Sequence, residues 1–540
     1  MKLRTALPWL VLAVASIGLV VHSLQYSYVS DDAYISFRYS YNLAMHGEFT
    51  FNLGERVEGY TNFLWALLLA GFIKLGLRSE VMSQVFATAF GCANLILIYL
   101  LTRIYRGGKP TGWDLLGALL LPACATFAVW CTGGLEAQMF AALTTAGITL
   151  YIAEQAGKAR LRFSGLLFAL AAMTRPEGLL FFGLTGIHRL TTNLIQEHRI
   201  RPSRAEIFWL LGFVIPFGVY FLWRYSYYGY LFPNTFYVKA GGTGLLMAKK
   251  WGFIYLWDFI HQNRLYVLAP CLLFLFQRPK IEFANNELPV GVRPSFVWTY
   301  IAPITFCFAA YVVWVGGDFM TMSRFFVPLM PLLAFVAQES IRSLVEKFPR
   351  RGINEWRPLR MIPTAVILLG LCIWNSVGLH KDNKNLSYYR WGLDTVAYLK
   401  KFANDRILIG NWMRRHLPKD TYLAVGGAGA IVYASRFKAL DAFGLNDEWI
   451  AHKAPRGGDR PGHSKFAPEH YVLEQKPDLI CHIGKHQDSL YRPPGTEVSY
   501  WNKRGYSWVC LNPPGLNPRY YCCLKRKDRD LGPIPIPVGS

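Results

Sequence analysis

The chain has 540 residues, of which 53% are hydrophobic and 15% aromatic, and its formal net charge is +23. The apolar residues come in long blocks rather than in short periodic stripes, which is typical of a multispan membrane protein. The basic residues lie mostly in short loops between these blocks, and no basic stripe with interleaved aromatic residues occurs, so the charge does not indicate a nucleic-acid partner.

Eleven apolar segments are candidate transmembrane helices. They are predicted at residues 7–24, 81–102, 114–130, 137–153, 163–173, 178–187, 207–223, 264–276, 297–315, 325–341 and 361–379. The first segment has the flanks of a signal peptide, but the many later spans favour an uncleaved anchor. Residues 61–77 are also apolar, and we interpret them as a helix or hairpin lying in the outer membrane interface.

The charges of the loops predict which side of the membrane each loop occupies. With the N-terminus in the cytoplasm, all predicted inner loops are rich in Lys and Arg. These inner loops are residues 103–109, 158–162, 188–204, 277–293 and 342–360, and the outer loops are residues 25–80, 131–136, 174–177, 224–263 and 316–324. Each short outer loop carries a carboxylate beside Gly, Pro or Arg, so we expect the active site on the extracytoplasmic face of a bacterial inner membrane.

The character of the chain changes after the last predicted span. Residues 1–379 are predicted to form the membrane domain, and residues 380–540 a soluble extracytoplasmic α/β domain of ordinary size. Its predicted strands are residues 422–425, 477–483, 506–511 and 520–524, and its first predicted helix is residues 395–417. The glycine-rich run at residues 426–430 lacks the GxGxxG spacing, so it predicts a tight strand-to-helix turn rather than a nucleotide site.

The cysteines give a weaker signal. In an oxidising compartment Cys510 could form a disulfide with Cys522 or Cys523. No CxxC or HExxH spacing occurs in the sequence, so we expect neither a dedicated metal site nor another cofactor.

The pair Asp31 and Asp32 directly follows the first predicted span. Two carboxylates beside an apolar membrane surface raise one another's pKa, which suits a general base that takes a proton from a sugar hydroxyl. The structural alternative is a helix N-cap, because an Asp there satisfies free backbone N–H groups. The sequence leaves open both the choice between these roles and the choice between the two residues.

Three cationic residues in the outer loops are candidates for binding a phosphate at the membrane surface: Arg175 and Arg324 by a bidentate fork, and Lys239 as a point charge. The structural alternative is an ion pair that only orients helix ends. Seven further residues of these loops are candidates for binding a sugar or an acceptor. They are Arg38, Glu58, Asn62, Glu136, Glu177, Asn234 and Asp318.

Read together and in order, the outer-loop motifs resemble the GT-C glycosyltransferases, most closely the AftB-type terminal arabinofuranosyltransferases of cell-wall arabinan. The motifs are DDAYISFRY from Asp31, GERVEGYTN from Gly54, GLE from Gly134, TRPEG from Thr174, PNTF from Pro233 and GGDFM from Gly316. The soluble part adds LDAFGLND from Leu440, GHSKFAP from Gly462 and KPDL from Lys476. The resemblance thus covers most of the chain.

This resemblance implies a polytopic α-helical membrane protein of GT-C type, with about eleven transmembrane helices and a C-terminal extracytoplasmic α/β domain. It also implies an inverting transferase that moves a sugar, with arabinofuranose the leading choice, from a polyprenyl-phosphate donor to a glycan or glycoconjugate acceptor. The family's base maps onto Asp31 or Asp32.

Two other interpretations stay open. One is a GT-C enzyme that transfers another sugar to protein or lipid A. The other is a transporter or flippase, for which inverted repeats and broken helices are typical. We find no internal repeat in the sequence.

Overall fold

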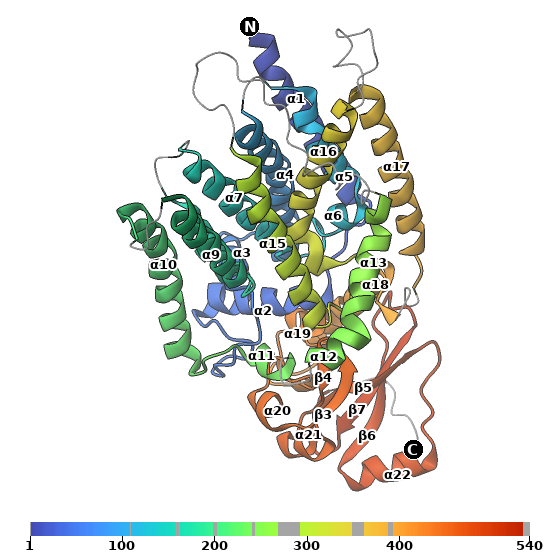
Figure 1. Cartoon of the computed structure of the whole chain (residues 1–540). Helices are drawn as coiled ribbons and strands as arrows, with labels where there is room; N and C mark the ends of the chain where they lie inside the picture. Colours follow the sequence, from blue (N-terminus) through green and yellow to red (C-terminus); the bar gives the residue numbers. More distant parts are fainter. Residues whose placement is uncertain are drawn as a thin grey trace, which may run out of the picture.

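The structure is a computed structural model. It describes residues 2–107, 110–157, 159, 162–197, 202–239, 244–267, 292–347, 361–386 and 392–532. Long helices fill one part of the molecule and a β-sheet domain the other, with the short helix α2 (Asp31–His46) lying crosswise between them (Figure 1). The predicted outer-loop residues therefore lie at the junction of the two parts.

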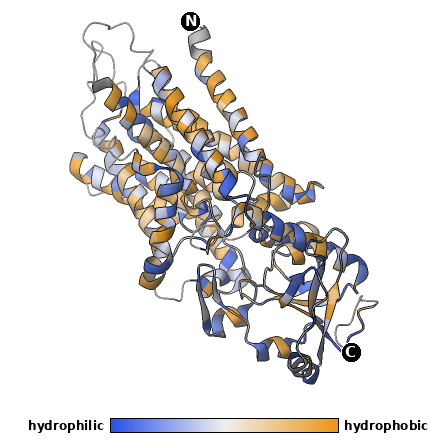
Figure 2. Ribbon diagram, turned by 90° about the vertical axis from the view of Figure 1, so that its right-hand side faces the viewer, coloured by the Kyte–Doolittle hydropathy of each residue, from blue (hydrophilic) through white to orange (hydrophobic). Residues whose placement is uncertain are grey.

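Within the described residues, six helical segments are long and apolar enough to cross a membrane. They lie in α1 (Lys2–Leu24), α4 (Ser79–Arg106), α10 (Arg204–Tyr228), α15 (Pro294–Trp314), η4 (Arg324–Leu329) with α16 (Met330–Lys347), and α17 (Met361–Asp382). All six coincide with predicted spans, and hydrophobic residues dominate these helices (Figure 2). The chain is therefore a multi-pass membrane protein.

Four other predicted spans also form helices, but these are not among the six that are long and apolar enough to cross a membrane. Residues 114–130 are divided among η1 (Gly112–Leu115), α5 (Leu116–Ala123) and α6 (Ala125–Val129). Pro122 lies inside α5, two residues before the break at Cys124. The remaining three are α7 (Ala137–Gln155), α8 (Ser164–Thr174) and α9 (Gly178–Glu197). Most of the predicted span 264–276 lies outside the described residues.

Several short helices connect the long helices of the bundle. The helix α3 (Phe63–Lys74) lies in the apolar segment that we placed in the membrane interface. Its twelve residues extend roughly 18 Å, too short to cross a bilayer core. The connection after α10 contains α11 (Asn234–Lys239), α12 (Gly244–Met247), η2 (Ala248–Gly252), α13 (Phe253–Gln262) and η3 (Leu265–Val267).

The C-terminal part contains a five-stranded mixed sheet in the order β2-β1-β5-β7-β6. The strands are β1 (Tyr422–Val425), β2 (Lys438–Asp441), β5 (Leu479–Gln487), β6 (Tyr506–Leu511) and β7 (Tyr520–Arg526), with a separate hairpin of β3 (Arg456–Arg460) and β4 (His463–Lys465). The helices are α18 (Val396–His416), α19 (Ala430–Ser435), α20 (Glu448–Lys453), α21 (Glu469–Gln475) and α22 (Gly495–Lys503). Strand β1 is parallel to both of its neighbours, β2 and β5, whereas β7 is antiparallel to both of its neighbours, β5 and β6.

Three sequence predictions for this part are confirmed. All four predicted strands and the first predicted helix are present, and the glycine-rich run is a turn between β1 and α19. Cys510 and Cys522, which are cross-strand partners on β6 and β7, form a disulfide. The strands β2, β3 and β4 were not predicted.

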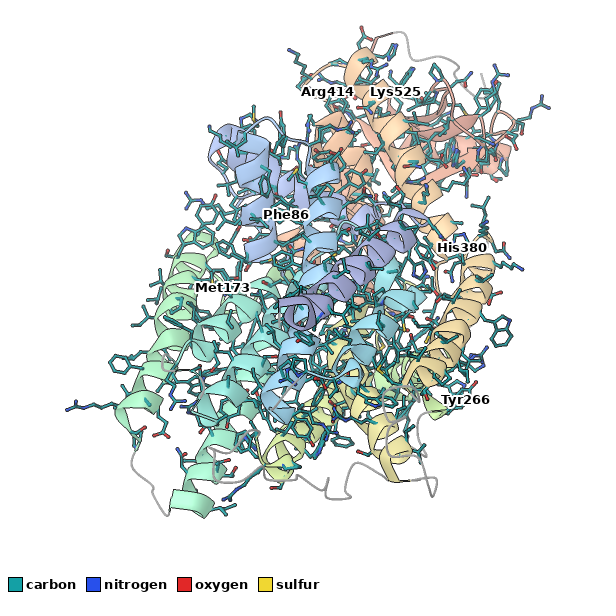
Figure 3. The ribbon with its side chains drawn as sticks, turned by 90° about the horizontal axis from the view of Figure 1, so that it is seen from above. Phe86, Met173, Tyr266, His380, Arg414 and Lys525 are labelled. Atoms are coloured by element: carbon teal, nitrogen blue, oxygen red, sulfur yellow. A yellow bond between two sulfur atoms is a disulfide. The ribbon has the colours of Figure 1, made fainter. Side chains whose placement is uncertain are left out.

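The two parts of the molecule pack tightly against each other. The Tyr433 ring on α19 lies 5.4 Å from the Tyr34 ring on α2, and its hydroxyl lies 2.9 Å from the Ser79 hydroxyl at the start of α4. A backbone bridge pairs Met320 with Asp394. Viewed from above, Phe86 lies among the bundle helices, whereas Arg414 and Lys525 lie on the C-terminal part at the edge of the molecule (Figure 3). The contacts of Tyr433 with α2 and α4 fix α2 and its carboxylates relative to the sheet.

Candidate active site

The structure gives the two neighbouring carboxylates different surroundings. Asp31 accepts hydrogen bonds from the backbone amides of Gly429, at 3.2 Å, and Ala430, at 2.8 Å, where the glycine-rich turn enters α19. Burial raises the pKa of the Asp31 carboxyl to about 6, although these amide hydrogen bonds act in the opposite direction. Asp31 therefore caps a helix, but one in the C-terminal part rather than its own.

Asp32 faces a different set of groups. It is half-buried, and it interacts electrostatically with Lys239, the last residue of α11, and with Arg324, the first residue of η4. Three elements far apart in the sequence thus bring an acidic group and two basic groups together.

Lys239 differs from the other two predicted cations because it has no hydrogen-bond or ion-pair partner among the described residues. Lys239 is exposed to solvent. Nearby protein groups nevertheless remove part of the hydration of its ammonium, which lowers the pKa of this group, whereas the charge of Asp32 raises it. An accessible ammonium without a partner is a suitable point charge for an anionic ligand.

Arg175 is held between two carboxylates. Its guanidinium lies 2.6 Å from Glu136 Oε1 and 2.9 Å from Glu177 Oε1. Asn62 donates a 2.8 Å hydrogen bond to the other oxygen of Glu136. Burial opposes the ionisation of Glu136, yet the charges of Arg175 and Arg324 keep the pKa of its carboxyl below the usual value. The ion pair that we considered as the structural alternative for Arg175 is therefore present.

Arg324 is paired as well. Its Nε lies 2.8 Å from Asp318 Oδ2, and its guanidinium lies over the rings of Trp130 and Phe325, at 5.7 and 5.1 Å from their centroids. The Arg175 guanidinium lies 4.8 Å from the centroid of the same Phe325 ring. One narrow pocket is lined by Ala137, Arg175, Glu177, Phe308, Val312, Arg324, Phe325 and Pro328. The two arginines thus belong to one charged, aromatic-lined region.

The loop that carries Asp318 has an unusual backbone. Gly316 and Gly317 adopt φ angles of +87° and +71°, and a Cβ on Gly317 would lie 2.4 Å from a ring carbon of Tyr255. Only glycine fits this close approach. The backbone conformation and the contact with Tyr255 therefore explain why the GGDFM motif begins with two glycines.

Three other predicted binding residues connect different parts of the chain. Arg38 donates to the carbonyls of Phe51 and Phe437, and Asn234 to the carbonyls of Gly444, Leu445 and Asp447. Glu58 forms a 2.8 Å ion pair with Arg224 of α10. These contacts account for the three residues structurally, and their binding of sugar stays a prediction.

Sequence reasoning did not select several residues of this region. Ser36 exchanges hydrogen bonds with the Asn62 amide at 3.1 and 3.0 Å, and Trp130 Nε1 donates a 2.7 Å hydrogen bond to the Met322 carbonyl. Ser36 belongs to the same motif as the Asp pair, four residues after Asp32, so helical spacing could have indicated it. Trp130 gives no comparable signal, because it ends an apolar segment.

A metal site is the remaining alternative for a cluster of carboxylates. Among the residues that the structure describes, no group of three or more His, Cys, Asp or Glu side chains is arranged to hold a metal ion. The carboxylates here are instead close to arginine, lysine or amide groups.

Two curated proteins are similar to this chain. The terminal beta-(1->2)-arabinofuranosyltransferase of Mycobacterium tuberculosis is 28% identical over 416 residues, which are 70% of this chain and 64% of that protein. The protein of the same name from Corynebacterium glutamicum is 24% identical over 338 residues, which are 57% of this chain and 47% of that protein. The chain thus spans less than two thirds of the length of these relatives.

A solved structure supports the same grouping at the level of the fold. ArnT from Cupriavidus metallidurans, in a crystal structure bound to undecaprenyl phosphate, superposes with a TM-score of 0.57 at 11% identity, covering 96% of this chain and 98% of ArnT. The chain therefore has the GT-C fold, and the predicted resemblance to GT-C and AftB-type enzymes is confirmed. Residues 396–521 match a family described as a domain of unknown function, DUF8728.

Proposed function

We propose that the protein is an inverting glycosyltransferase that moves a sugar from a polyprenyl-phosphate donor to a glycan or glycoconjugate acceptor outside the cytoplasm. Arabinofuranose is the leading sugar, because the two curated relatives carry the name of arabinofuranosyltransferases. The ArnT crystals contain bound undecaprenyl phosphate, which supports a polyprenyl-phosphate donor. The observation that carries the proposal is the half-buried Asp32 beside Lys239, which is accessible and has no ion-pair partner in the described part of the chain.

In this mechanism Asp32 is the general base. Its carboxylate takes the proton of the acceptor hydroxyl while the hydroxyl oxygen attacks the anomeric carbon of the donor sugar. The bond between that carbon and the phosphate oxygen breaks, its electron pair stays on the phosphate, and the configuration inverts because the displacement is single. Lys239 stabilises the departing polyprenyl phosphate, with Arg324 adding positive charge nearby.

In this proposal Asp31 has a positioning role. Both of its oxygens are occupied by backbone amides of the turn before α19. It therefore holds α2 against the C-terminal part and keeps its neighbour directed at the donor site.

The test compares Asp32→Asn with Asp31→Asn in the purified full-length protein, with a polyprenyl-phosphoryl arabinofuranose donor and an arabinan acceptor. We expect Asp32→Asn to lower the transfer rate by about 100-fold or more with an unchanged melting temperature. Asp31→Asn should mainly lower the melting temperature. Near-normal turnover of Asp32→Asn would remove it as the base, and loss of activity in a stable Asp31→Asn protein would exchange the two roles.

A further inference from the structure

A second pocket lies between the first outer loop and the C-terminal part, apart from the charged cluster described above. Its volume is about 510 Å³, within the range of ligand sites. It is lined by residues 55–57 of the first outer loop, by Tyr230, and by residues of the C-terminal part that include Tyr471 and residues of α20. The proposed mechanism uses none of these residues.

Aromatic rings form a rigid platform in this pocket. The half-buried Trp449 ring stacks on the buried Tyr471 ring, with centroids 4.1 Å apart and an interplanar angle of 7°. The Tyr471 hydroxyl donates to Asp447 at 3.1 Å, which fixes the ring. Tyr230 lies 4.7 Å from the exposed His452 ring. Flat aromatic faces combined with polar groups at their edges suit a ligand that has both apolar and hydroxyl-bearing faces.

The charges of the pocket favour a neutral ligand. Three carboxylates, Glu55, Asp447 and Glu448, and two cations, Arg56 and Lys453, are among its lining residues. Carboxylates accept hydrogen bonds from hydroxyls and repel an anion, which makes the pocket unlike a phosphate site. Because the two cations offset most of the negative charge, a basic peptide is a weaker candidate than a polyol.

The helix α11 connects this pocket to the charged cluster. The Tyr237 ring on α11 lies 4.2 Å from the His452 ring of the pocket, and Lys239 is two residues further along the same six-residue helix. Two helical residues rise roughly 3 Å along the helix axis. A chain-like ligand in the pocket can therefore direct one end at Asp32.

We propose that this pocket binds the inner residues of a neutral glycan acceptor and presents its terminal hydroxyl to the catalytic carboxylate. This inference rests on the proposed glycosyltransferase function. Trp449 is the stacking platform, and Glu448, whose carboxylate accepts a hydrogen bond from the Tyr230 hydroxyl, binds sugar hydroxyls at the rim.

The test measures binding of a linear arabinofuranose pentasaccharide to the full-length protein by calorimetry, and in parallel the acceptor and donor KM values in the transfer assay. We expect Trp449→Ala to weaken pentasaccharide binding and to raise the acceptor KM by about tenfold, with donor KM and kcat nearly unchanged. Glu448→Gln, at an exposed position, should show a smaller effect in the same direction. Tyr500→Ala, on the exposed surface of α22, is the matched aromatic control and should change neither value.

Unchanged pentasaccharide binding and acceptor KM in Glu448→Gln and in a folded Trp449→Ala protein would overturn the proposal. If Trp449→Ala does not fold, an unchanged Glu448→Gln overturns it alone. Binding of a Lys-rich peptide that depends on Trp449, with no pentasaccharide binding, would also overturn it in favour of a protein ligand. If the wild type transfers no sugar yet binds the pentasaccharide through Trp449, the pocket assignment stands and the proposed catalytic function fails.

Discussion

Asp31 and Asp32 are neighbours in the sequence, but tertiary packing separates their surroundings. Adjacent residues on a helix point about 100° apart, so one carboxylate reaches the turn before α19 while the other faces Lys239 and Arg324. The general base and the N-cap were alternatives for the pair, and the structure offers one position for each role. No local pattern distinguishes them, because the partner turn lies almost 400 residues away.

The raised pKa of Asp31 predicts a pH-dependent contribution to stability. Burial raises the pKa of this carboxyl from 3.8 to about 6, so the folded protein binds its proton more tightly than the unfolded chain. The resulting stabilisation is complete below about pH 4 and is lost as the pH rises through about 6. The melting temperature of the wild type relative to Asp31→Asn should therefore fall over this interval and stay level above it, corresponding to at most about 3 kcal/mol. A difference that is constant from pH 4 to pH 7 would contradict the assignment.

Removing the charge of Lys239 should weaken donor binding without loss of stability. A charge-assisted hydrogen bond contributes roughly 1.5 to 3 kcal/mol, so Lys239→Ala should lower donor affinity by about 10-fold to 150-fold. Its melting temperature should stay near that of the wild type, because no partner among the described residues loses an ion pair. Lys419→Ala, at an exposed position of the C-terminal part, is the matched control.

Arg175→Ala provides the contrasting case. The substitution leaves the buried Glu136 and the neighbouring Glu177 without their cation, so the protein should lose stability as well as activity. Donor affinity and melting temperature measured together separate the two cases. If Lys239→Ala destabilises the protein and Arg175→Ala lowers only donor affinity, the phosphate is bound by Arg175 instead.

At the scale of elements, the strand-to-helix turn at residues 426–430 joins the two parts of the molecule. A Cβ on Gly429 would lie 1.9 Å from the Asp31 carbonyl oxygen, a backbone atom that cannot move without displacing α2. We expect Gly429→Ala to cost at least the ~1–3 kcal/mol typical of overpacking and to lower activity through the displaced α2. Thermal unfolding of Gly429→Ala and of Gly495→Ala, where a Cβ meets no atom within 4 Å, measures this effect. Equal melting temperatures would show that the turn does not hold α2.

The elements that the sequence predicted share a strong local signal, and those that it missed lack one. The six long apolar helices and the four predicted strands follow from hydrophobic length and pattern alone. The division of residues 114–130 into three short helices was not predicted, because these residues form a nearly continuous apolar run. The strand β2 is as short as β1, but its sequence KALD has no β-branched or aromatic residue, so its pairing with β1 rather than its own pattern defines it.

The sequence also could not predict which groups the polar residues of the candidate site contact. Arg38 and Asn234 lie in motifs that suit sugar binding, yet the groups they contact are backbone carbonyls of the C-terminal part. A side chain that binds a hydroxyl and one that binds a carbonyl have the same donors, so composition cannot tell them apart. Trp449 and Tyr471 were not selected because their stacking joins residues of separate helices.

At the scale of the whole molecule, α4 extends from one end of the bundle to the other. Ser79 at its start contacts Tyr433 of the C-terminal part, and Arg106 at its end pairs with Glu339 of α16. Its 28 residues extend roughly 42 Å, enough to cross a membrane. Arg103 and Arg342 both pair with Asp114 at the end away from the sheet. Arg103, Arg106 and Arg342 therefore lie at the opposite end of the bundle from the sheet.

This arrangement predicts the orientation of the protein in the membrane. Short Lys/Arg-rich loops resist translocation, so the end with Arg103 and Arg342 should be cytoplasmic, and the sheet, Asp32 and Lys239 should lie outside. Alkaline phosphatase, which is active only after export, should therefore be active when fused after Leu417 and inactive when fused after Arg351. A cytoplasmic reporter such as green fluorescent protein, fused at the same two positions, should give the opposite pattern. If phosphatase activity instead appears only after Arg351, the site faces the cytoplasm, and a donor and acceptor on the outer side of the membrane could not reach it.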